Sequence, residues 1–243
     1  MKPFVGLSIK EIIFNKVDLI SSDDLTALKS KIYEEYNKDR VFFTSTINNN
    51  GIEELKKARP NYSILSEEFG IEKNKDKNNT WIIDPIDGTV NFLHGIPHFA
   101  ISIALQSHEE IICGLIFDPI KNEMFYAEKD SGAFFNNHRV RVSKKNQIND
   151  CLFVTGGKVK NELDLPYRKS GCAALDMAYV AAGRYDGYFQ YKLNIWDIAA
   201  GVILIKEAGG IINDIDLTVN ENIKVIASSP DINDKLHKKL VNF

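Results

Sequence analysis

The hydrophobic positions near the start of the chain follow a helical period. In residues 23–38 apolar side chains recur every three or four positions behind an aspartate, which predicts a helix. A second, shorter helix is expected from about Asn50 to Arg59, because Pro60 cannot continue it.

Between Tyr62 and His138 the pattern changes to short apolar runs. Turn residues separate these runs, which read SIL, TWII, FAISIALQ, IICGLIF, EMFYAE and GAFF. Runs of this length bounded by turn residues predict a sheet of mostly antiparallel strands.

The second half of the chain alternates between strand and helix patterns. Strands are expected at 151–155, at 187–190 and near residues 211 and 225, and helices at 171–182, 196–208 and 231–240. This order predicts an α/β fold (α+β in some schemes), namely a layered sandwich of two sheets with helices between and outside them.

A polar and charged stretch, Lys144 to Asp150, separates two predicted subdomains. We expect an N-terminal α+β subdomain over residues 1–145 and a C-terminal α/β subdomain over residues 146–243. With 243 residues, 44% of them hydrophobic, the chain is long enough to bury a shared core as one compact unit.

Composition and charge exclude several classes of protein. The net charge of −3 and the pI near 6.0 provide no basic field for nucleic acid or an anionic membrane. Three cysteines without a CxxC pair favour a reducing compartment. Charged residues interrupt the N-terminal apolar stretches, so neither a signal peptide nor a membrane span is expected. We therefore predict a cytoplasmic protein.

The segment WIIDPIDGT, residues 81–89, is the most informative in the chain. An apolar strand is expected to end at Asp84, where Pro85 stops the ladder, and Asp87 follows three residues after Asp84. Two carboxylates are thus aimed at one point beyond the strand end. Together with the Ile86 carbonyl they are suitable ligands for Mg²⁺, which prefers oxygen.

Gly88 and Thr89 complete this segment. Gly88 lets the backbone approach a ligand closely, and Thr89 offers a hydroxyl and a main-chain N–H to an oxyanion, especially if a helix starts there. The structural alternative for the whole segment is a pair of surface turns, Asp-Pro and Asp-Gly.

Acidic residues recur in two other contexts of this kind. Glu67 and Glu68 follow the short strand YSIL, and Asp197 lies in the first turn of an apolar helix. Each has a structural alternative: the glutamates suit a solvated loop, and Asp197 suits the positive end of a helix dipole.

Together these segments resemble the signature segments of the inositol monophosphatase family, in its bacterial branch. The resemblance runs from about Pro60 to Pro230 and rests on SEEFG (66–70), DPIDGTVNF (84–92), GAFFNNHRVRVS (132–143), SGCAALDMAYVAAGRYDGYF (170–189) and WDIAAGVILIKEAGG (196–210). It implies an alternating αβαβα sandwich of the sugar-phosphatase type, usually assembled as a homodimer.

The resemblance also implies a set of metal ligands. Glu67, Asp84 and the Ile86 carbonyl resemble the ligands of a first Mg²⁺, and Asp84, Asp87 and Asp197 resemble those of a second. A third, weaker ion would contact Glu67 through water, and Mn²⁺ is an expected substitute. The metals would activate the attacking water and, with Asp197, stabilise the departing alkoxide.

Other residues resemble the substrate-binding positions of the family. Gly88 and Thr89 look like the phosphate-binding pair. Gly171, Cys172 and Ala173 look like the segment that faces the rest of the substrate.

Two positions depart from the family pattern. Gln190 stands where members with inositol monophosphatase activity carry a glutamate that contacts substrate hydroxyls, and glutamine is only a neutral partner. The second position is that of the acid that orients the attacking water with Thr89, for which the sequence offers two alternatives. Asp24 lies in a turn similar to that of the family, whereas the turn Thr44–Asn48 is better placed relative to Glu67 but has no acid.

The leading hypothesis is a Mg²⁺-dependent phosphomonoesterase acting on inositol monophosphate or a similar small phosphate ester. Within the same family, 3′(2′),5′-bisphosphate nucleotidase, fructose-1,6-bisphosphatase and histidinol-phosphatase are alternatives. The alternative of another class is a weakly active relative that works through protein contacts with the transcription machinery.

Overall fold

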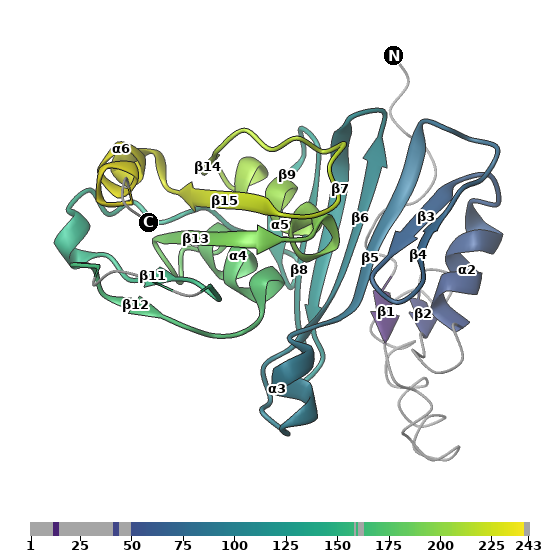
Figure 1. The fold of residues 1–243 in the computed structure, drawn as a ribbon, viewed down its shortest axis with the longest axis horizontal. Coiled ribbons are helices and arrows are strands. Elements are labelled where there is room, and N and C mark those ends of the chain that lie inside the picture. Colours follow the sequence, from purple (N-terminus) through teal and green to yellow (C-terminus); the bar gives the residue numbers. More distant parts are fainter. Residues whose placement is uncertain (1–11, 15–40, 44–49, 158, 160–162, 241–243) are drawn as a thin grey trace.

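Helices and two sheets alternate in layers in the computed structural model of the chain (Figure 1). The structure describes residues 12–14, 41–43, 50–157, 159 and 163–240. The predicted helix at 23–38 lies outside these residues. Within them the layers run from α2 (Asn50–Ala58) through a large sheet, a pair of helices and a smaller sheet to α6 (Pro230–Lys239).

The large sheet has the strand order β10-β9-β8-β7-β6-β5-β3-β4. Its strands are β3 (Ser63–Ser66), β4 (Gly70–Glu72), β5 (Asn79–Asp87), β6 (Ala100–Ser107), β7 (Glu110–Asp118), β8 (Glu123–Glu128), β9 (Gly132–Phe135) and β10 (His138–Arg139). Every pair is antiparallel except β3 with β5, which run parallel. The predicted, mostly antiparallel sheet over 62–138 is confirmed.

The smaller sheet has the order β12-β11-β13-β15-β14. Its strands are β11 (Phe153–Val154), β12 (Tyr167–Arg168), β13 (Gly187–Leu193), β14 (Ile211–Ile212) and β15 (Ile223–Ser228). A separate parallel pair joins β1 (Ile12–Phe14) to β2 (Val41–Phe43). The short η3 turn (Ile148–Asp150) lies in the polar stretch between the two sheets, but the proposed subdomain boundary at 145/146 stays a prediction.

Two helices, α4 (Ala173–Ala181) and α5 (Ile195–Glu207), fill the space between the sheets. They are apolar on nearly all sides because both sheets cover them. Gly114 on β7 allows one close approach, since an added Cβ would lie 2.7 Å from the Cα of Ala200. This confirms the predicted layered α/β sandwich with helices between and outside two sheets.

Alternating side chains of β5 explain why both faces of the large sheet are buried. Ile82 points into the cluster around α4 and α5, whereas Trp81 and Ile83 belong to the cluster on the opposite face. On that opposite face Leu55 of α2 joins the same cluster. A period of two therefore divides the strand between two cores.

The remaining predicted elements lie where expected, with one correction at β5. The helix from about Asn50 is α2, and the expected helices at 171–182, 196–208 and 231–240 are α4, α5 and α6. The prediction that the strand ends at Asp84 was wrong. The ladder breaks only locally at Pro85, which has no N–H, and resumes at Asp87.

No helix in the described ranges is long and apolar enough to cross a membrane.

Candidate active site

Glu67 and Asp84 lie at the same end of the large sheet, on two neighbouring strands. Glu67 directly follows β3, and Asp84 lies just before the irregularity in β5. Strands β3 and β5 are parallel, and Ser66 pairs with Ile83. The Glu67 N–H then donates to the Ile83 carbonyl at 3.2 Å. Each carboxylate is the next residue after this pair, so the parallel register sets them side by side.

A bulge in β5 brings a second aspartate to this end. Asp84 pairs with Ser102 and Asp87 with Ala100, so β5 has one extra residue between these two pairs. The Asp84 carboxylate accepts a hydrogen bond from the Ile86 N–H at 2.9 Å, which closes the bulge. Bulges of this kind redirect side chains beside functional sites.

The turn after the bulge is held by Gly88 and Thr89. Gly88 has φ of 91°, and a Cβ there would come within 3.1 Å of the His98 carbonyl and 3.3 Å of the Cys172 Cβ. The exposed Thr89 begins the short helix α3 (Thr89–Leu93), and its hydroxyl donates to the Ile86 carbonyl at 2.9 Å. Only glycine fits the backbone at position 88 without strain.

The segment before α4 is fastened to Asp87. The Asp87 carboxylate accepts hydrogen bonds from the Ala174 N–H at 2.5 Å and the Cys172 thiol at 3.1 Å. Gly171, with φ of 82°, lies against the Asn91 side chain, which donates to the carbonyls of His98 and Ser170. These contacts bring residues 171–173 to the Asp84–Asp87 bulge.

Asp197 reaches the site from the small sheet through α5. It is the third residue of that helix, and its carboxylate accepts the Asn194 N–H at 2.8 Å in a capping box. The preceding strand β13 ends at Leu193, so the strand end and the helix cap together fix the position of the carboxylate.

The three aspartates of this group have raised pKa values, mainly because they are buried. Burial, followed by the charges of Asp87, Glu67 and Asp197, raises the pKa of Asp84 well above its ordinary value. Burial also raises the pKa of Asp87 to about 6, against the opposing effect of the Ala174 N–H. Burial raises that of Asp197 to about 7, to which the charges of Asp87 and Glu67 add. All four acids therefore lie within electrostatic range of one another.

The donor set fits a hard divalent cation. In the described ranges no lysine or arginine forms an ion pair with any of these four acids. Nor do any three His, Cys, Asp or Glu side chains there converge into a set spaced to hold one ion. Asp87 and Asp197 each accept a hydrogen bond from a main-chain N–H. Buried carboxylates without basic neighbours nevertheless require compensating positive charge, and oxygen donors suit Mg²⁺.

The structure brings most of the predicted site residues together. Asp84 lies within electrostatic range of Glu67, Asp87 and Asp197, and Ile86, Gly88 and Thr89 form the bulge and turn. Cys172 contacts Asp87, and Gly171 and Ala173 flank it in the chain. Gln190 lies on β13, which leads to Asp197. Asp24 and the Thr44–Asn48 turn lie outside the described residues.

Three residues that hold segments of the site in place were not predicted from the sequence. Asn91 ties α3 to the segment before α4, and the fully buried Asp176 accepts the Ser170 hydroxyl at 2.6 Å. The Tyr188 hydroxyl donates to the Gln190 side chain at 2.9 Å. The sequence feature that could have identified Asp176 is its position as the only acid in the apolar run AALDMAYVA.

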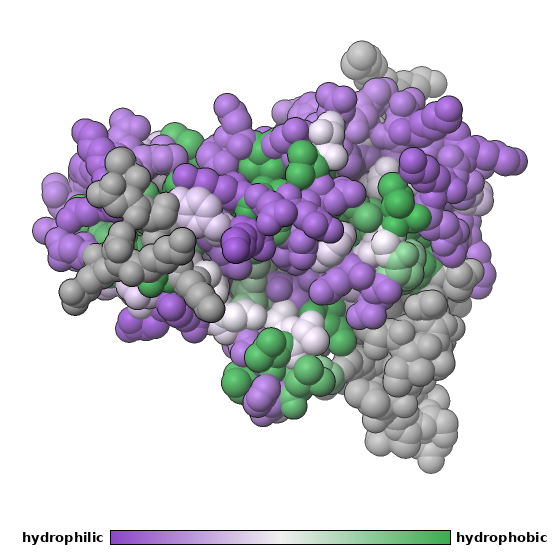
Figure 2. Space-filling model, viewed as in Figure 1, coloured by the Kyte–Doolittle hydropathy of each residue, from purple (hydrophilic) through white to green (hydrophobic). Residues whose placement is uncertain are grey.

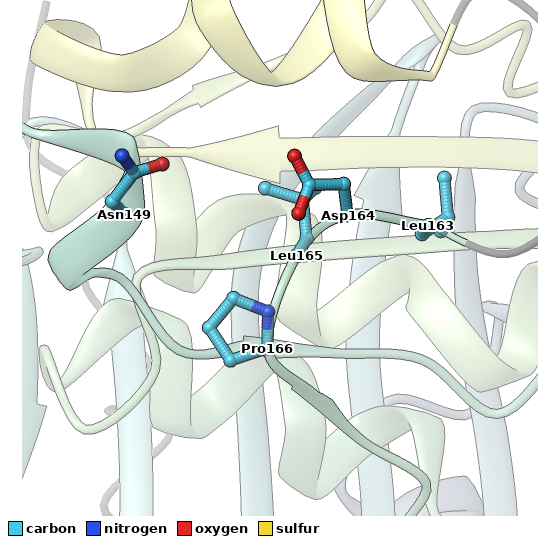
Figure 3. A pocket seen from close by; sticks show the side chains of 5 residues that line it. All are labelled: Asn149, Leu163, Asp164, Leu165 and Pro166. Carbon is cyan, nitrogen blue, oxygen red and sulfur yellow. The ribbon is translucent and has the colours of Figure 1, made fainter.

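A pocket of about 590 Å³ lies elsewhere, beside η3 and the segment before β12 (Figure 3). It is lined by Asn149, Leu163, Asp164, Leu165 and Pro166. Its single carboxylate, that of Asp164, is almost fully exposed and pairs with Lys239 at 2.9 Å. The lining offers no buried charge for chemistry, so the carboxylate group described above is the candidate site.

Known proteins of similar sequence and structure cover most of this chain. A protein of Caulobacter vibrioides named inositol-1-monophosphatase is 40% identical over 206 residues, which are 76% of this chain and 80% of that protein. A Haemophilus influenzae protein named Nus factor SuhB is 41% identical over 180 residues, 68% of this chain and 67% of the other. The crystal structure of extragenic suppressor protein suhB from Bartonella henselae matches with a TM-score of 0.74 and 41% identity, covering 79% of this chain and 81% of that one.

The model of the inositol monophosphatase family matches residues 27–243, which include Glu67, Asp84, Asp87 and Asp197. The order of the layers and the identity to relatives point the same way. The chain therefore belongs to the inositol monophosphatase family of metal-dependent phosphoric monoester hydrolases.

Proposed function

We propose that the chain is a Mg²⁺-dependent phosphomonoesterase that hydrolyses inositol monophosphate or a similar small phosphate ester. The observation that carries the proposal is the group of four acids at one end of the large sheet. Two of them, Asp84 and Asp87, are buried, and burial raises the pKa of both carboxyl groups. The charges of Asp87, Glu67 and Asp197 raise the pKa of Asp84 further.

The same acids would hold the metal ions. Glu67, Asp84 and the Ile86 carbonyl are proposed for a first Mg²⁺, and Asp84, Asp87 and Asp197 for a second, with a third ion near Glu67. When bound, such ions offset phosphate charge and lower the pKa of a coordinated water. Mn²⁺ has the same preference for oxygen and is expected to substitute.

Thr89 is placed to orient the attacking water. Its hydroxyl proton is committed to the Ile86 carbonyl, so the lone pairs of Oγ1 remain free to accept a hydrogen bond from water. Thr89 is exposed, whereas the neighbouring Asp87 is buried, so the hydroxyl lies where solvent can reach it. We propose that Gly88 and Thr89 also bind the phosphate, and that residues 171–173 face the rest of the substrate.

A panel of phosphate esters assayed with the purified chain and Mg²⁺ tests this proposal. Inositol monophosphate, a 3′(2′),5′-bisphosphonucleotide, fructose 1,6-bisphosphate and histidinol phosphate cover the substrates of the family alternatives. We expect release of phosphate that a chelator abolishes and Mg²⁺ or Mn²⁺ restores. No release from any ester, with metal present, would refute the proposal.

A second class of function is supported by the relative named Nus factor SuhB. In this alternative the chain is weakly active and works through protein contacts with the transcription machinery. Retention of the buried Asp84 and Asp87 favours the enzyme, because uncompensated acids destabilise a fold that does not use them. Co-purification with transcription proteins from an extract, unchanged in a variant lacking Asp84, would support this second function.

We also propose a cytoplasmic homodimer. The exposed apolar side chains Val90, Leu93 and Ile96 lie on α3 and just after it, at 69%, 73% and 48% exposure. Figure 2 shows apolar surface at the place that α3 has in Figure 1. A second copy of the chain would shield these side chains from water. Light scattering should give the mass of a dimer, and Leu93→Asp should shift it towards the monomer.

A further inference from the structure

The side-chain amide of Gln190 has a defined orientation. Its Oε1 atom lies 2.8 Å from the Gly156 main-chain nitrogen and 2.9 Å from the Tyr188 hydroxyl. A main-chain N–H can only donate, so the atom facing it must be the amide oxygen. The two donors occupy both lone pairs of that oxygen. The Nε2 group, with two N–H donors, is therefore the end of Gln190 left for another partner.

The surrounding backbone is shaped to hold this orientation. Strands β11 and β13 are parallel, with Val154 paired to Tyr188, so the loop after β11 runs beside Gln190. A Cβ on Gly156 would lie only 2.5 Å from Oε1, so glycine alone permits this approach. In the described part of the chain no hydrogen bond engages Nε2, and the side chain is only partly buried.

Tyr188 connects Gln190 to the acids of the active site. Its side chain is fully buried, and burial together with the charges of Asp176, Asp87 and Asp197 raises the pKa of its hydroxyl. The hydroxyl therefore lies within electrostatic range of two proposed metal ligands and touches Gln190 at the same time. β13 also breaks its pairing with β15 between Gln190 and Leu193, just before the helix that carries Asp197. Gln190 thus contacts a tyrosine that lies within electrostatic range of the site, and it lies on the strand that leads to Asp197.

We propose that Gln190 determines specificity by donating its Nε2–H groups to a proton-free acceptor on the substrate, a carboxylate or a second phosphate. This inference rests on the proposed phosphomonoesterase function and names the substrate class within it. A hydroxyl can accept one of these hydrogen bonds, but an anionic group accepts them more strongly. A carboxylate side chain at position 190 would instead repel an anionic group and accept from a hydroxyl.

Matched pairs of substrates test the proposal with the full chain and saturating Mg²⁺. Each pair shares one phosphate ester frame and differs in one group: hydroxymethyl against carboxylate in one arm, hydroxyl against a second phosphate in the other. The readout is the ratio of kcat/KM for the anionic member to kcat/KM for the neutral member. We expect wild type to favour the anionic member in at least one arm, and that arm identifies the acceptor.

The variant Gln190→Glu should lower this ratio at least about tenfold, because like charges then face each other. Gln190→Met removes the donors without adding charge and should bring the ratio close to one. Ratios that are the same in wild type and Gln190→Glu for every pair would overturn the inference. If Gln190→Glu does not fold, as judged by circular dichroism, the Gln190→Met ratio decides alone. Failure of wild type to hydrolyse any ester would instead count against the proposed function.

Discussion

Two groups of buried aspartates in this molecule can be compared. Asp118 and Asp186 are 0% and 2% exposed, as buried as Asp84 at 1%. Yet Asp118 pairs with Lys121 and Asp186 with Lys145, whereas Asp84 has mainly other acids around it. The charges of Asp118 and Asp186 are compensated by lysines of the same chain. Several acids gathered in one place without a basic neighbour need a cation from outside, and this difference separates Asp118 and Asp186 from the proposed catalytic acids.

The largest expected effect is on activity. Asp84→Asn should lower kcat/KM by about 10³-fold or more, because it removes the proposed bridging ligand. Asp186→Asn, an equally buried acid, should stay within about twofold of wild type, since it touches only structural partners. Initial rates of phosphate release measure both variants, and circular dichroism checks their folds. Near-wild-type turnover of Asp84→Asn would mean that the bridging ligand is misplaced.

A second expected effect is an inverted dependence of stability on pH. The folded-state pKa values of Asp87 and Asp197, about 6 and about 7, exceed the ordinary value of 3.8. The folded state therefore binds more protons than the unfolded state between these values. The free energy of unfolding of the metal-free protein should fall, on the order of a few kcal/mol, as pH rises from 4 to 8.

Urea unfolding in the presence of a chelator measures this slope. Asp87→Asn should flatten it, because the variant has one fewer acid to deprotonate. Stability of the metal-free wild type that rises steadily up to pH 8 would contradict the account.

The paired acids predict a smaller, metal-independent effect. The Asp186 carboxylate accepts the Leu152 N–H at 2.7 Å and the Lys145 ammonium at 2.9 Å. Asp186→Asn should lower the free energy of unfolding by about 1–3 kcal/mol, and Mg²⁺ should not change that difference. The exposed pair of Asp164 and Lys239, also 2.9 Å apart, is the matched control. Asp164→Asn should change stability by less than about 0.5 kcal/mol.

The smallest expected effect concerns the acid that orients the attacking water. If Asp24 is only a helix cap, Asp24→Asn should leave kcat within about twofold, because asparagine caps equally well. Asn48→Asp should then raise turnover by adding the missing acid. A loss of about 10²–10⁴-fold in kcat for Asp24→Asn would assign the role to Asp24 instead.

Local patterns predicted much of this fold because they reflect local causes. The apolar runs of β5, β6 and β7 and the nearly all-apolar α5 follow from burial on two sides, which the sequence displays directly. The continuation of β5 past Pro85 could not be predicted in this way. It depends on Asp87 pairing with Ala100, a contact made only once β6 is in place.

The candidate site also has parts that local patterns predict and parts that depend on the tertiary fold. The acids were found from the sequence because each lies at the end of a short apolar run or in the first turn of a helix. The contacts that position them join distant segments: Ala174 and Cys172 bond Asp87, more than eighty residues away. The orientation of Gln190 likewise depends on Gly156 from another strand end. Such pairings are properties of the tertiary fold and leave no local pattern.

The most direct test of the central claim is the thermal unfolding midpoint as Mg²⁺ is added at pH 7.5. Because the four acids repel one another, Mg²⁺ binding to the folded state should raise the midpoint continuously. At a hundredfold excess of Mg²⁺ over Kd, binding adds about 2.7 kcal/mol to the free energy of unfolding. Asp84→Asn should abolish most of this rise, and Asp186→Asn should keep it in full. A wild-type midpoint that stays unchanged up to millimolar Mg²⁺ would contradict the assignment of Glu67, Asp84, Asp87 and Asp197 as a metal-dependent phosphatase site.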